Sequence, residues 1–388
     1  MKSYNGLFAA MVDEAEVSAA IAETAKHKKK RRVVRWALEH QEELAHKTAQ
    51  CLINGTWKPP LHPSFAIQEG AHRKQREIVK PRWNNEQIVH HLLMRQFQKI
   101  LLPRIYHYAC GTVIARGPHF AMQTMKRWRD GYKGQRFYVA EMDVRKFYAN
   151  IDQTILKRQL RRVIRDKQYL RVLFRVIDGH PSGLPLGYYT SPFLGMFYLL
   201  DFDNYVVQQL RPDHYLRFMD NLWLFGRNKK ELHRKMRAMM DYLSRELRLT
   251  IKDDWQVFRF EGERGFREPK ETEGDTRGRR KKKHPRGRAI NALGFVIHRD
   301  RITIRKSILK RIRAKANHIK RRGRCTVHDA AAILSQMGWL RWADAYQYFQ
   351  DWIKPNVSIR YCRRRVSRAA KTRDRERKKD HDKLADGT

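Results

Sequence analysis

Apolar residues recur along the chain at two spacings, one typical of helices and one typical of strands. Helical spacing predicts helices over residues 8–52, 86–102, 119–129, 151–165, 191–210 and 229–247. Asp152 and Ser191 are the expected N-caps of two of them. Short apolar runs predict strands at 137–142, 215–218 and 222–225, with a hairpin turn at Asp220-Asn221. This order of elements predicts an α+β fold, an antiparallel sheet backed by helices.

The rest of the chain alternates between basic extended segments and basic helices. Residues 64–80 are extended, and Lys74 and Arg76 alternate so that both side chains share one face of a strand. Residues 261–288 are too charged to bury a core and are expected to be disordered or to order on nucleic acid. Strands follow over 292–304 and helices over 307–321 and 326–353, and the charged tail after 355 is expected to be unstructured.

The formal net charge of +43 indicates which class of partner the protein binds. Such a field attracts polyanions, and the basic residues interleave with Trp, Tyr and Phe, which stack on bases. We therefore expect a nucleic-acid partner rather than an anionic membrane surface. The basic run at residues 27–32 is either a solvated face or a contact for a nucleic-acid strand, and both interpretations stay open.

Cysteine usage and hydropathy limit the cellular location. Cys51, Cys110, Cys325 and Cys362 are scattered without CxxC or Cys/His pairing, which predicts intracellular thiols rather than a zinc site or a disulfide framework. The sequence has neither the apolar segment of a signal peptide nor a run of about 18 apolar residues. We expect a cytoplasmic protein without a membrane span.

Two aspartates stand where apolar strands end. Asp143 follows the strand at 137–142, and Asp220 lies in the hairpin turn. If these strands are neighbours, the two carboxylates meet and can hold Mg²⁺, the usual metal of phosphoryl transfer. A lone aspartate at either place is more often a cap or turn residue, so the prediction depends on the blocks around the pair.

Those blocks occur in the order of the sequence blocks of reverse transcriptases. They read EMDVRKFYANID, GLPLGYYTSP, YLRFMDNLWLFG, LRLTIKDDWQVF and NALGFVIHRDRITIRKS. From about residue 73 to 355 the chain resembles bacterial and phage enzymes of the group that includes diversity-generating retroelements, retrons and group II introns. The resemblance implies a right-hand polymerase: an N-terminal helical basic region at 1–54, fingers at 55–135, a palm at 136–304 with the charged insertion 261–288, a helical thumb at 305–355 and a basic tail at 356–388.

The resemblance also implies roles for single residues. Asp143 and Asp220 resemble the two metal-binding aspartates of catalysis, with the Val144 carbonyl and Asn221 as further ligands. Tyr148 resembles the aromatic gate that crowds the sugar 2′ position, although packing in the core is the alternative. The expected nucleotide-binding residues are Lys74, Arg76, Tyr148, Leu186, Gly187 and Lys252, and the expected primer grip is Leu293-Gly294.

The chain departs from the family pattern at two positions of this site. Asn221 stands where the family has a third acidic residue, which implies weaker metal binding or a changed choice of metal. Leu186 stands where most of the family has glutamine, which implies low fidelity as in diversity-generating enzymes. Pro192 follows Ser191 where those enzymes have glutamine, so the subgroup stays open.

The expected function is RNA-directed DNA synthesis, extending a primer 3′-hydroxyl with dNTPs on an RNA template with Mg²⁺ or Mn²⁺. The expected partners are the RNA template and a DNA or RNA primer, with a structured non-coding RNA and an accessory protein as further candidates. One alternative is a phage-defence enzyme with self-templated or template-independent synthesis. Another is a non-catalytic RNA-binding descendant, for which Asn221 is the argument. In the thumb, Trp339, Trp342 and Tyr346 are expected in the core and the arginines of 307–321 on nucleic acid.

Overall fold

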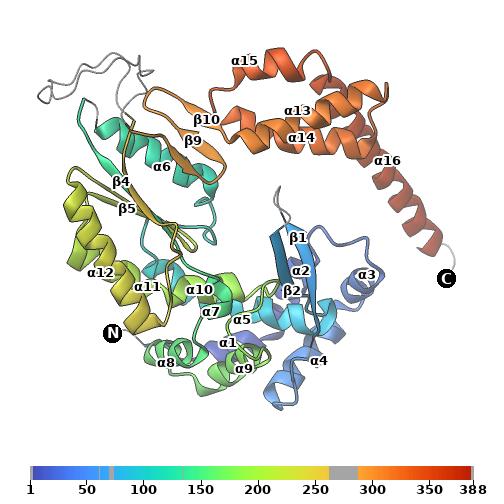
Figure 1. Ribbon diagram of the computed structural model, residues 1–388. Coiled ribbons are helices and arrows are strands. Elements are labelled where there is room, and N and C mark those ends of the chain that lie inside the picture. Colours follow the sequence, from blue (N-terminus) through green and yellow to red (C-terminus); the bar gives the residue numbers. More distant parts are fainter. Residues whose placement is uncertain (1–2, 61, 70–73, 133, 262–286, 386–388) are drawn as a thin grey trace, which may run out of the picture. The chain divides into compact units, whose positions relative to one another are not determined.

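The structure is a computed structural model that describes residues 3–60, 62–69, 74–132, 134–261 and 287–385 (Figure 1). The chain divides into two compact units. Unit 1 comprises Met1–Ala121 and Phe137–Phe258, and unit 2 comprises Met122–Arg136 and Arg259–Thr388. The described residues combine many helices with largely antiparallel sheets, so the predicted α+β class is confirmed. Among the described helices, none is long and apolar enough to cross a membrane.

The helices of unit 1 precede, interrupt and follow its strands. They are α1 (Leu7–Val12), α2 (Glu14–Ala25), α3 (Arg32–Glu39), α4 (Gln41–Ile53), η1 (Trp83–Gln87), α5 (Ile88–Leu101), η2 (Leu102–Arg104), α7 (Phe147–Asn150), α8 (Gln153–Val163), α9 (Lys167–Asp178), α10 (Ser191–Tyr198), α11 (Leu200–Tyr205), η3 (Val206–Leu210) and α12 (Lys229–Leu247). Its strands are β1 (Ser64–Glu69), β2 (Lys74–Val79), β3 (Ala109–Cys110), β4 (Tyr138–Asp143), β5 (His214–Phe218), β6 (Asn221–Gly226) and β7 (Gln256–Arg259).

A five-stranded sheet in the order β3-β5-β6-β4-β7 forms the centre of unit 1. The pairs β5-β6 and β6-β4 are antiparallel, and the short β3 runs parallel to β5. The apolar run Leu222–Phe225 is buried, which explains why β6 lies in the middle of the sheet. Helix α12 packs against β4 and β6, with Leu232 close to Gly226 (Figure 1).

Two predicted helix caps have different outcomes. Asp152 caps α8 as expected, because its Oδ1 accepts hydrogen bonds from the amides of Thr154 at 2.8 Å and Ile155 at 3.0 Å. The expected Ser191 cap is wrong. The N-cap of α10 is Thr190, and the Ser191 hydroxyl instead donates to the Pro185 carbonyl at 2.7 Å, which ties the helix to the preceding loop.

Strands β1 and β2 form the antiparallel hairpin that the extended pattern over 64–80 predicted. Its register pairs Ser64 with Val79 and Glu69 with Lys74. The Arg76 side chain on β2 is exposed, whereas that of Lys74 lies outside the described side chains. Of the predicted insertion 261–288, residues 262–286 also lie outside the described part of the chain.

Unit 2 contains a small sheet and a helical bundle. Helix α6 (Pro118–Gly131) lies mostly in this unit, and the antiparallel sheet has the order β10-β9-β8. The Arg129 guanidinium donates to the His298 carbonyl at 2.6 Å, which joins α6 to this sheet. The strands are β8 (Ile290–Ala292), β9 (Phe295–Ile297) and β10 (Ile302–Ile304), and the other helices are α13 (Lys306–Arg321), α14 (Val327–Arg341), α15 (Tyr346–Tyr348), η4 (Phe349–Ile353) and α16 (Ile359–Ala385).

Unit 2 overturns two sequence predictions. The tail expected to be unstructured forms α16, because its few apolar residues recur at helical spacing and Cys362 and Val366 pack into the core of the bundle. The expected burial of all three thumb aromatics is also wrong. Trp339 packs against the core, but Trp342 and Tyr346 are 40% and 75% exposed, because α14 ends at Arg341 and breaks the helical spacing.

Candidate active site

The sheet of unit 1 places Asp143 beside the hairpin turn that holds Asp220. Asp143 ends β4 and pairs in register with Asn221, the first residue of β6. Phe218 and Asn221 close the β5-β6 hairpin, so its turn consists of Met219 and Asp220, and the expected turn at Asp220-Asn221 is wrong by one residue. The Val144 amide donates to the Asp220 carbonyl at 3.1 Å. The structure therefore brings together all four residues that the sequence suggested as metal ligands.

The charge of Asp143 acts on Asp220. Burial raises the pKa of Asp220, and the negative charge of Asp143 raises it further. The positive charges of Lys252 and Arg76 act in the opposite direction, which places both side chains within electrostatic reach of the turn. The Asn221 amide nitrogen lies 3.4 Å from Asp220 Oδ1, so it donates only a long hydrogen bond.

Lys252 forms an ion pair with Asp143. Its Nζ lies 2.6 Å from Asp143 Oδ1, and its backbone amide donates to the Asp143 carbonyl at 2.9 Å. A bridge between Val144 and Ile251 holds the two segments together. Because about a third of each side chain is exposed, solvent screens the ion pair and we expect it to exchange readily with other partners.

Tyr148 lies on α7 next to the turn, directly after the apolar Phe147. Burial raises the pKa of its hydroxyl, and the negative charge of Asp220 raises it further, so the phenol stays protonated. Gly195 on α10 leaves room for the ring, since a Cβ there would come within 3.2 Å of Tyr148 Cε1. The ring is therefore packed from behind and only half-buried.

The loop before α10 connects Tyr148 to the β1-β2 hairpin. The Leu184 amide donates to the Tyr148 carbonyl at 2.7 Å, and the Leu186 carbonyl accepts from the Val79 amide at 2.8 Å. Gly187 has a φ of 105°, and a Cβ there would lie 2.2 Å from the Val79 carbonyl oxygen. Only glycine fits this close approach. Leu186 and Gly187 thus reach the site through their backbone.

A buried ion pair beneath the turn escaped the sequence analysis. Arg217 on β5 is fully buried, and its Nε donates to Asp203 Oδ1 at 2.8 Å. Its Nη1 donates to the Met219 carbonyl at 3.1 Å, so the pair holds the turn from below. The Tyr215 hydroxyl donates to the same Asp203 oxygen at 2.8 Å. The available signal was an arginine between the apolar residues Leu216 and Phe218 of a predicted strand.

Gly111 shapes the other side of the turn. Met219 has a φ of 55°, in the left-handed region that is costly for a residue with a side chain. Its amide donates to the Cys110 carbonyl at 3.1 Å. Its Sδ lies only 2.6 Å from where a Cβ on Gly111 would be, so glycine leaves the space that the methionine occupies.

The donor set of this site fits Mg²⁺. Two carboxylates, the Asn221 amide oxygen and the Val144 carbonyl are hard oxygen ligands of the kind that Mg²⁺ and Mn²⁺ prefer. Burial, and after it the negative charge of Asp143, raise the pKa of Asp220, and a bound cation would favour the ionised form of this carboxyl. Within the described residues there is no cluster of three His, Cys, Asp or Glu side chains suited to a metal, so the site has one carboxylate fewer than the sequence blocks of the family suggest.

Leu293 and Gly294 form a turn of unit 2, between β8 and β9. Their φ values are 52° and 88°, and the Gly294 carbonyl accepts from the Arg305 amide at 2.8 Å. The predicted turn is therefore present. Because it belongs to the other unit, its part in a primer grip stays a prediction.

Residues 82–273 match the family model described as reverse transcriptase (RNA-dependent DNA polymerase). The matched residues contain Asp143, Tyr148, Gly187, Asp220 and Lys252. They form a reverse transcriptase domain. Together with the mixed helices and sheets, the match confirms the expected right-hand polymerase fold for this domain.

The chain shares little sequence with the following curated protein and solved structures that it resembles. The group II intron-encoded protein LtrA of Lactococcus lactis subsp. cremoris is 26% identical over 182 residues, which are 43% of this chain and 29% of that protein. The chain thus spans less than a third of the curated relative that it matches. A telomerase from Candida albicans, solved in complex with a TWJ fragment of telomeric RNA, gives a TM-score of 0.43 at 9% identity, covering 67% of this chain and 49% of that one. An apo telomerase from Candida tropicalis gives 0.44 at 10% identity, covering 68% and 60%.

Proposed function

We propose that the protein is an RNA-directed DNA polymerase that extends a primer 3′-hydroxyl with dNTPs on an RNA template. The observation that supports this most directly is the register of β4 against β6, which sets Asp143 beside Asp220 within the family-matched residues. Sheet geometry alone brings the carboxylates together, although 76 residues separate them in the sequence.

Asp143 and Asp220 would hold Mg²⁺, with the Val144 carbonyl and the Asn221 amide oxygen completing the ligand set. Bound there, Mg²⁺ would neutralise the charge that develops on the attacking and leaving oxygens of phosphoryl transfer. Asn221 removes one negative charge from the set, so we expect a higher Mg²⁺ requirement. Manganese, which binds such ligands more tightly, should support activity at lower concentration.

The basic side chains around the aspartates suit a triphosphate. Arg76 is exposed on β2 and its charge reaches Asp220. We assign Arg76, with Lys74 two residues before it, to the incoming phosphates and Lys252 to the leaving pyrophosphate. The side chains of Leu186 and Gly187 cannot donate a hydrogen bond to the incoming nucleotide. This loop therefore contacts the nucleotide only through its shape, and we expect DNA synthesis of low fidelity.

Tyr148 would exclude ribonucleotides. Its ring is packed against Gly195 and cannot retreat, so a 2′-hydroxyl would meet it directly. The Leu293-Gly294 turn would hold the primer end, as the resemblance implies.

The first test is primer extension by the purified chain on an RNA template, with dNTPs and Mg²⁺. Asp143→Asn should reduce the rate at least about 1,000-fold, because the ligand charge is lost while shape is kept. Asp254→Asn is the matched control, since Asp254 is exposed on a neighbouring turn, and it should stay within twofold of wild type. Extension by Asp143→Asn at the wild-type rate would refute the assignment.

One observation favours a second function, RNA binding without synthesis. Lys252 already neutralises Asp143, and Asn221 supplies no charge, so the site is less anionic than two-metal chemistry usually requires. The same assay separates the candidates. Reactions without added template would also reveal self-templated or template-independent synthesis, the activity expected of a phage-defence enzyme.

A further inference from the structure

The β1-β2 hairpin buries little surface of its own. Of the described side chains of β1 and β2, only that of Val79 is buried, and the hairpin projects from the helices around it (Figure 1). A two-stranded hairpin is at best marginally stable by itself in water. Contacts at its two ends, Ser64 and Val79, should therefore decide where the hairpin lies.

One buried carboxylate, that of Glu86, contacts the chain on both sides of the hairpin. Glu86 lies in η1 and is fully buried. Its Oε2 accepts from the Arg82 amide at 3.0 Å, three residues after β2 ends. The same oxygen pairs with Nε2 of His62, two residues before β1 begins. Glu86 thus fastens both ends of the hairpin to η1 and to helix α5, which follows it.

The same helical segment also holds the loop against which the hairpin packs. Burial raises the pKa of the Tyr188 hydroxyl in this loop, and the negative charge of Glu86 raises it further, so the two groups lie within electrostatic reach. The centres of the Tyr188 and His90 rings are 4.7 Å apart, and the Tyr189 ring stacks on that of His91 at 3.7 Å. The hairpin and the loop are therefore attached to one helix.

The hairpin carries Arg76 toward the candidate active site. Arg76 is exposed on β2, and its positive charge lowers the pKa of Asp220. The interaction of a guanidinium with a phosphate weakens as the distance between them grows, so a small movement of the hairpin changes it. A group that fixes the base of the hairpin therefore sets the position of Arg76.

We propose that Glu86 is a positioning residue for the incoming nucleotide: it fixes the β1-β2 hairpin so that Arg76 meets the triphosphate. This inference rests on the proposed function in one respect, the assignment of Arg76 to the phosphates. Glu86 itself does not contact the nucleotide, because its side chain is fully buried. Loss of its contacts would free the base of the hairpin, and the effect would fall on binding of the triphosphate rather than on the chemical step.

The experiment measures binding of a base-labelled dATP to the full chain by fluorescence anisotropy. Mg²⁺ is present, with an RNA template annealed to a primer that ends in a dideoxynucleotide, so no synthesis takes place. Glu86→Met keeps the length of the side chain but removes both oxygens, and it should weaken binding of the triphosphate about tenfold. Glu86→Gln keeps an oxygen that can accept from His62 and Arg82, and it should stay within about threefold of the wild type.

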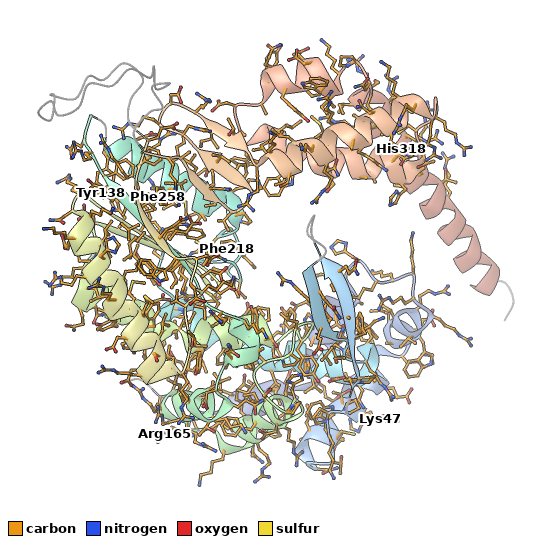
Figure 2. The ribbon with its side chains drawn as sticks, in the orientation of Figure 1. Lys47, Tyr138, Arg165, Phe218, Phe258 and His318 are labelled. Atoms are coloured by element: carbon orange, nitrogen blue, oxygen red, sulfur yellow. The ribbon has the colours of Figure 1, made fainter. Side chains whose placement is uncertain are left out.

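Asp166→Leu is the matched control for a loss of stability. Asp166 is also buried and accepts from the amides of Phe8 at 2.8 Å and Tyr169 at 3.0 Å, so it too joins distant segments of unit 1. Figure 2 shows its neighbour Arg165 well apart from Phe218, which lies beside the aspartate turn. The control should lower the melting temperature as the test variant does, yet change the affinity for the triphosphate less than about twofold.

A second comparison asks whether Glu86 acts through the cations of the hairpin. Lys74→Gln/Arg76→Gln should itself weaken binding of the triphosphate. Adding Glu86→Met should then weaken it by less than about twofold more, because the cations that Glu86 positions are gone. If the wild type extends primers, Glu86→Met should raise KM for the dNTP about tenfold and lower kcat less than about threefold.

Three results would overturn the proposal. They are equal affinity of the wild type and Glu86→Met for the triphosphate, an equal loss in the Asp166→Leu control, and a full further loss when Glu86→Met is added to Lys74→Gln/Arg76→Gln. A wild type that binds the triphosphate but extends no primer would refute the proposed function, while a loss of binding in Glu86→Met would still support the role of Glu86.

Discussion

Two hairpin turns of this protein both contain a residue in the left-handed conformation, but they differ at the next position. Met219-Asp220 connects β5 to β6 and Leu293-Gly294 connects β8 to β9, and each turn begins with a residue in the left-handed region, at φ values of 55° and 52°. The second position differs. Gly294 has a φ of 88°, which costs glycine little, whereas Asp220 has a side chain and lies outside that region.

The difference is explained by what each turn has to present. The β8-β9 turn presents backbone, and Gly294 lies against the Trp339 ring. The β5-β6 turn presents a carboxylate beside a second carboxylate, so it needs external support. The buried pair of Arg217 and Asp203 supplies that support through the Met219 carbonyl. A turn that positions charge is thus held by a buried charge, and one that positions backbone is held by an aromatic ring.

The largest effect is expected when the buried ion pair that supports the Met219-Asp220 turn is removed. Arg217→Met leaves Asp203 buried without its cation and should lower the free energy of unfolding by about 3–5 kcal/mol. The double variant Arg217→Met/Asp203→Leu should recover at least half of that loss, as followed by urea denaturation. It should still extend primers at least about tenfold more slowly, because the Met219 carbonyl has lost its donor. A double variant with wild-type extension would show that the pair only stabilises the fold.

A smaller effect is expected from the aromatic side chain that lies beside the aspartate turn. Tyr148→Val opens space where a 2′-hydroxyl would lie and should reduce discrimination against ribonucleotides about 10- to 100-fold. The measurement is the ratio of kcat/KM for a dNTP and its rNTP on the same primer and template. The value for the dNTP serves as the internal control and should change less than about fivefold. An unchanged ratio of the two kcat/KM values would show that Tyr148 only packs in the core.

The backbone turn should respond to crowding instead. Gly294→Ala places a Cβ 2.7 Å from the Trp339 ring, whereas Gly323→Ala, at a φ of 63°, meets nothing within 4 Å. Both substitutions introduce left-handed strain of about 1 kcal/mol. Gly294→Ala should therefore destabilise the protein by about 1–2 kcal/mol more than Gly323→Ala, measured by thermal unfolding. Equal costs would mean that the ring moves aside freely.

The smallest expected effect concerns the strain between the two carboxylates. Because the pKa of Asp220 is raised in the folded state, its ionisation destabilises the fold as the pH rises through the interval above the ordinary value of 3.8. Asp220→Asn should thus raise the melting temperature in metal-free buffer by about 2 °C at neutral pH. The difference should shrink as the pH falls and vanish below the ordinary value of 3.8, where the carboxyl is protonated in both the folded and the unfolded state. A variant less stable than wild type at neutral pH would contradict this.

The sequence was sufficient for the elements that apolar runs define. The strand before Asp143 and the strands on either side of Asp220 were predicted within a residue or two of β4, β5 and β6, because a buried strand must be continuously apolar. The resemblance to known blocks then assigned roles to Tyr148 and Lys252, and the structure places both near the aspartates.

What the sequence could not show depends on tertiary contacts. Charge alone does not reveal that Arg217 is buried, since only the position of Asp203 on another element makes its burial tolerable. The Ser191 hydroxyl had a second acceptor, Pro185, that no local rule identifies. In unit 2, a few apolar positions were enough to fold α16 against the bundle, although the segment reads as a charged tail.

The central claim is that Asp143 and Asp220 support synthesis although Asn221 replaces the third carboxylate. It is tested most directly by comparing primer extension of the wild type and Asn221→Asp on an RNA template across a Mg²⁺ series. We predict that both proteins extend the primer and that Asn221→Asp reaches half its maximal rate at about tenfold lower Mg²⁺, because an added carboxylate strengthens binding of the ion. A wild type that is silent at every Mg²⁺ and Mn²⁺ concentration, beside an active Asn221→Asp variant, would contradict the account.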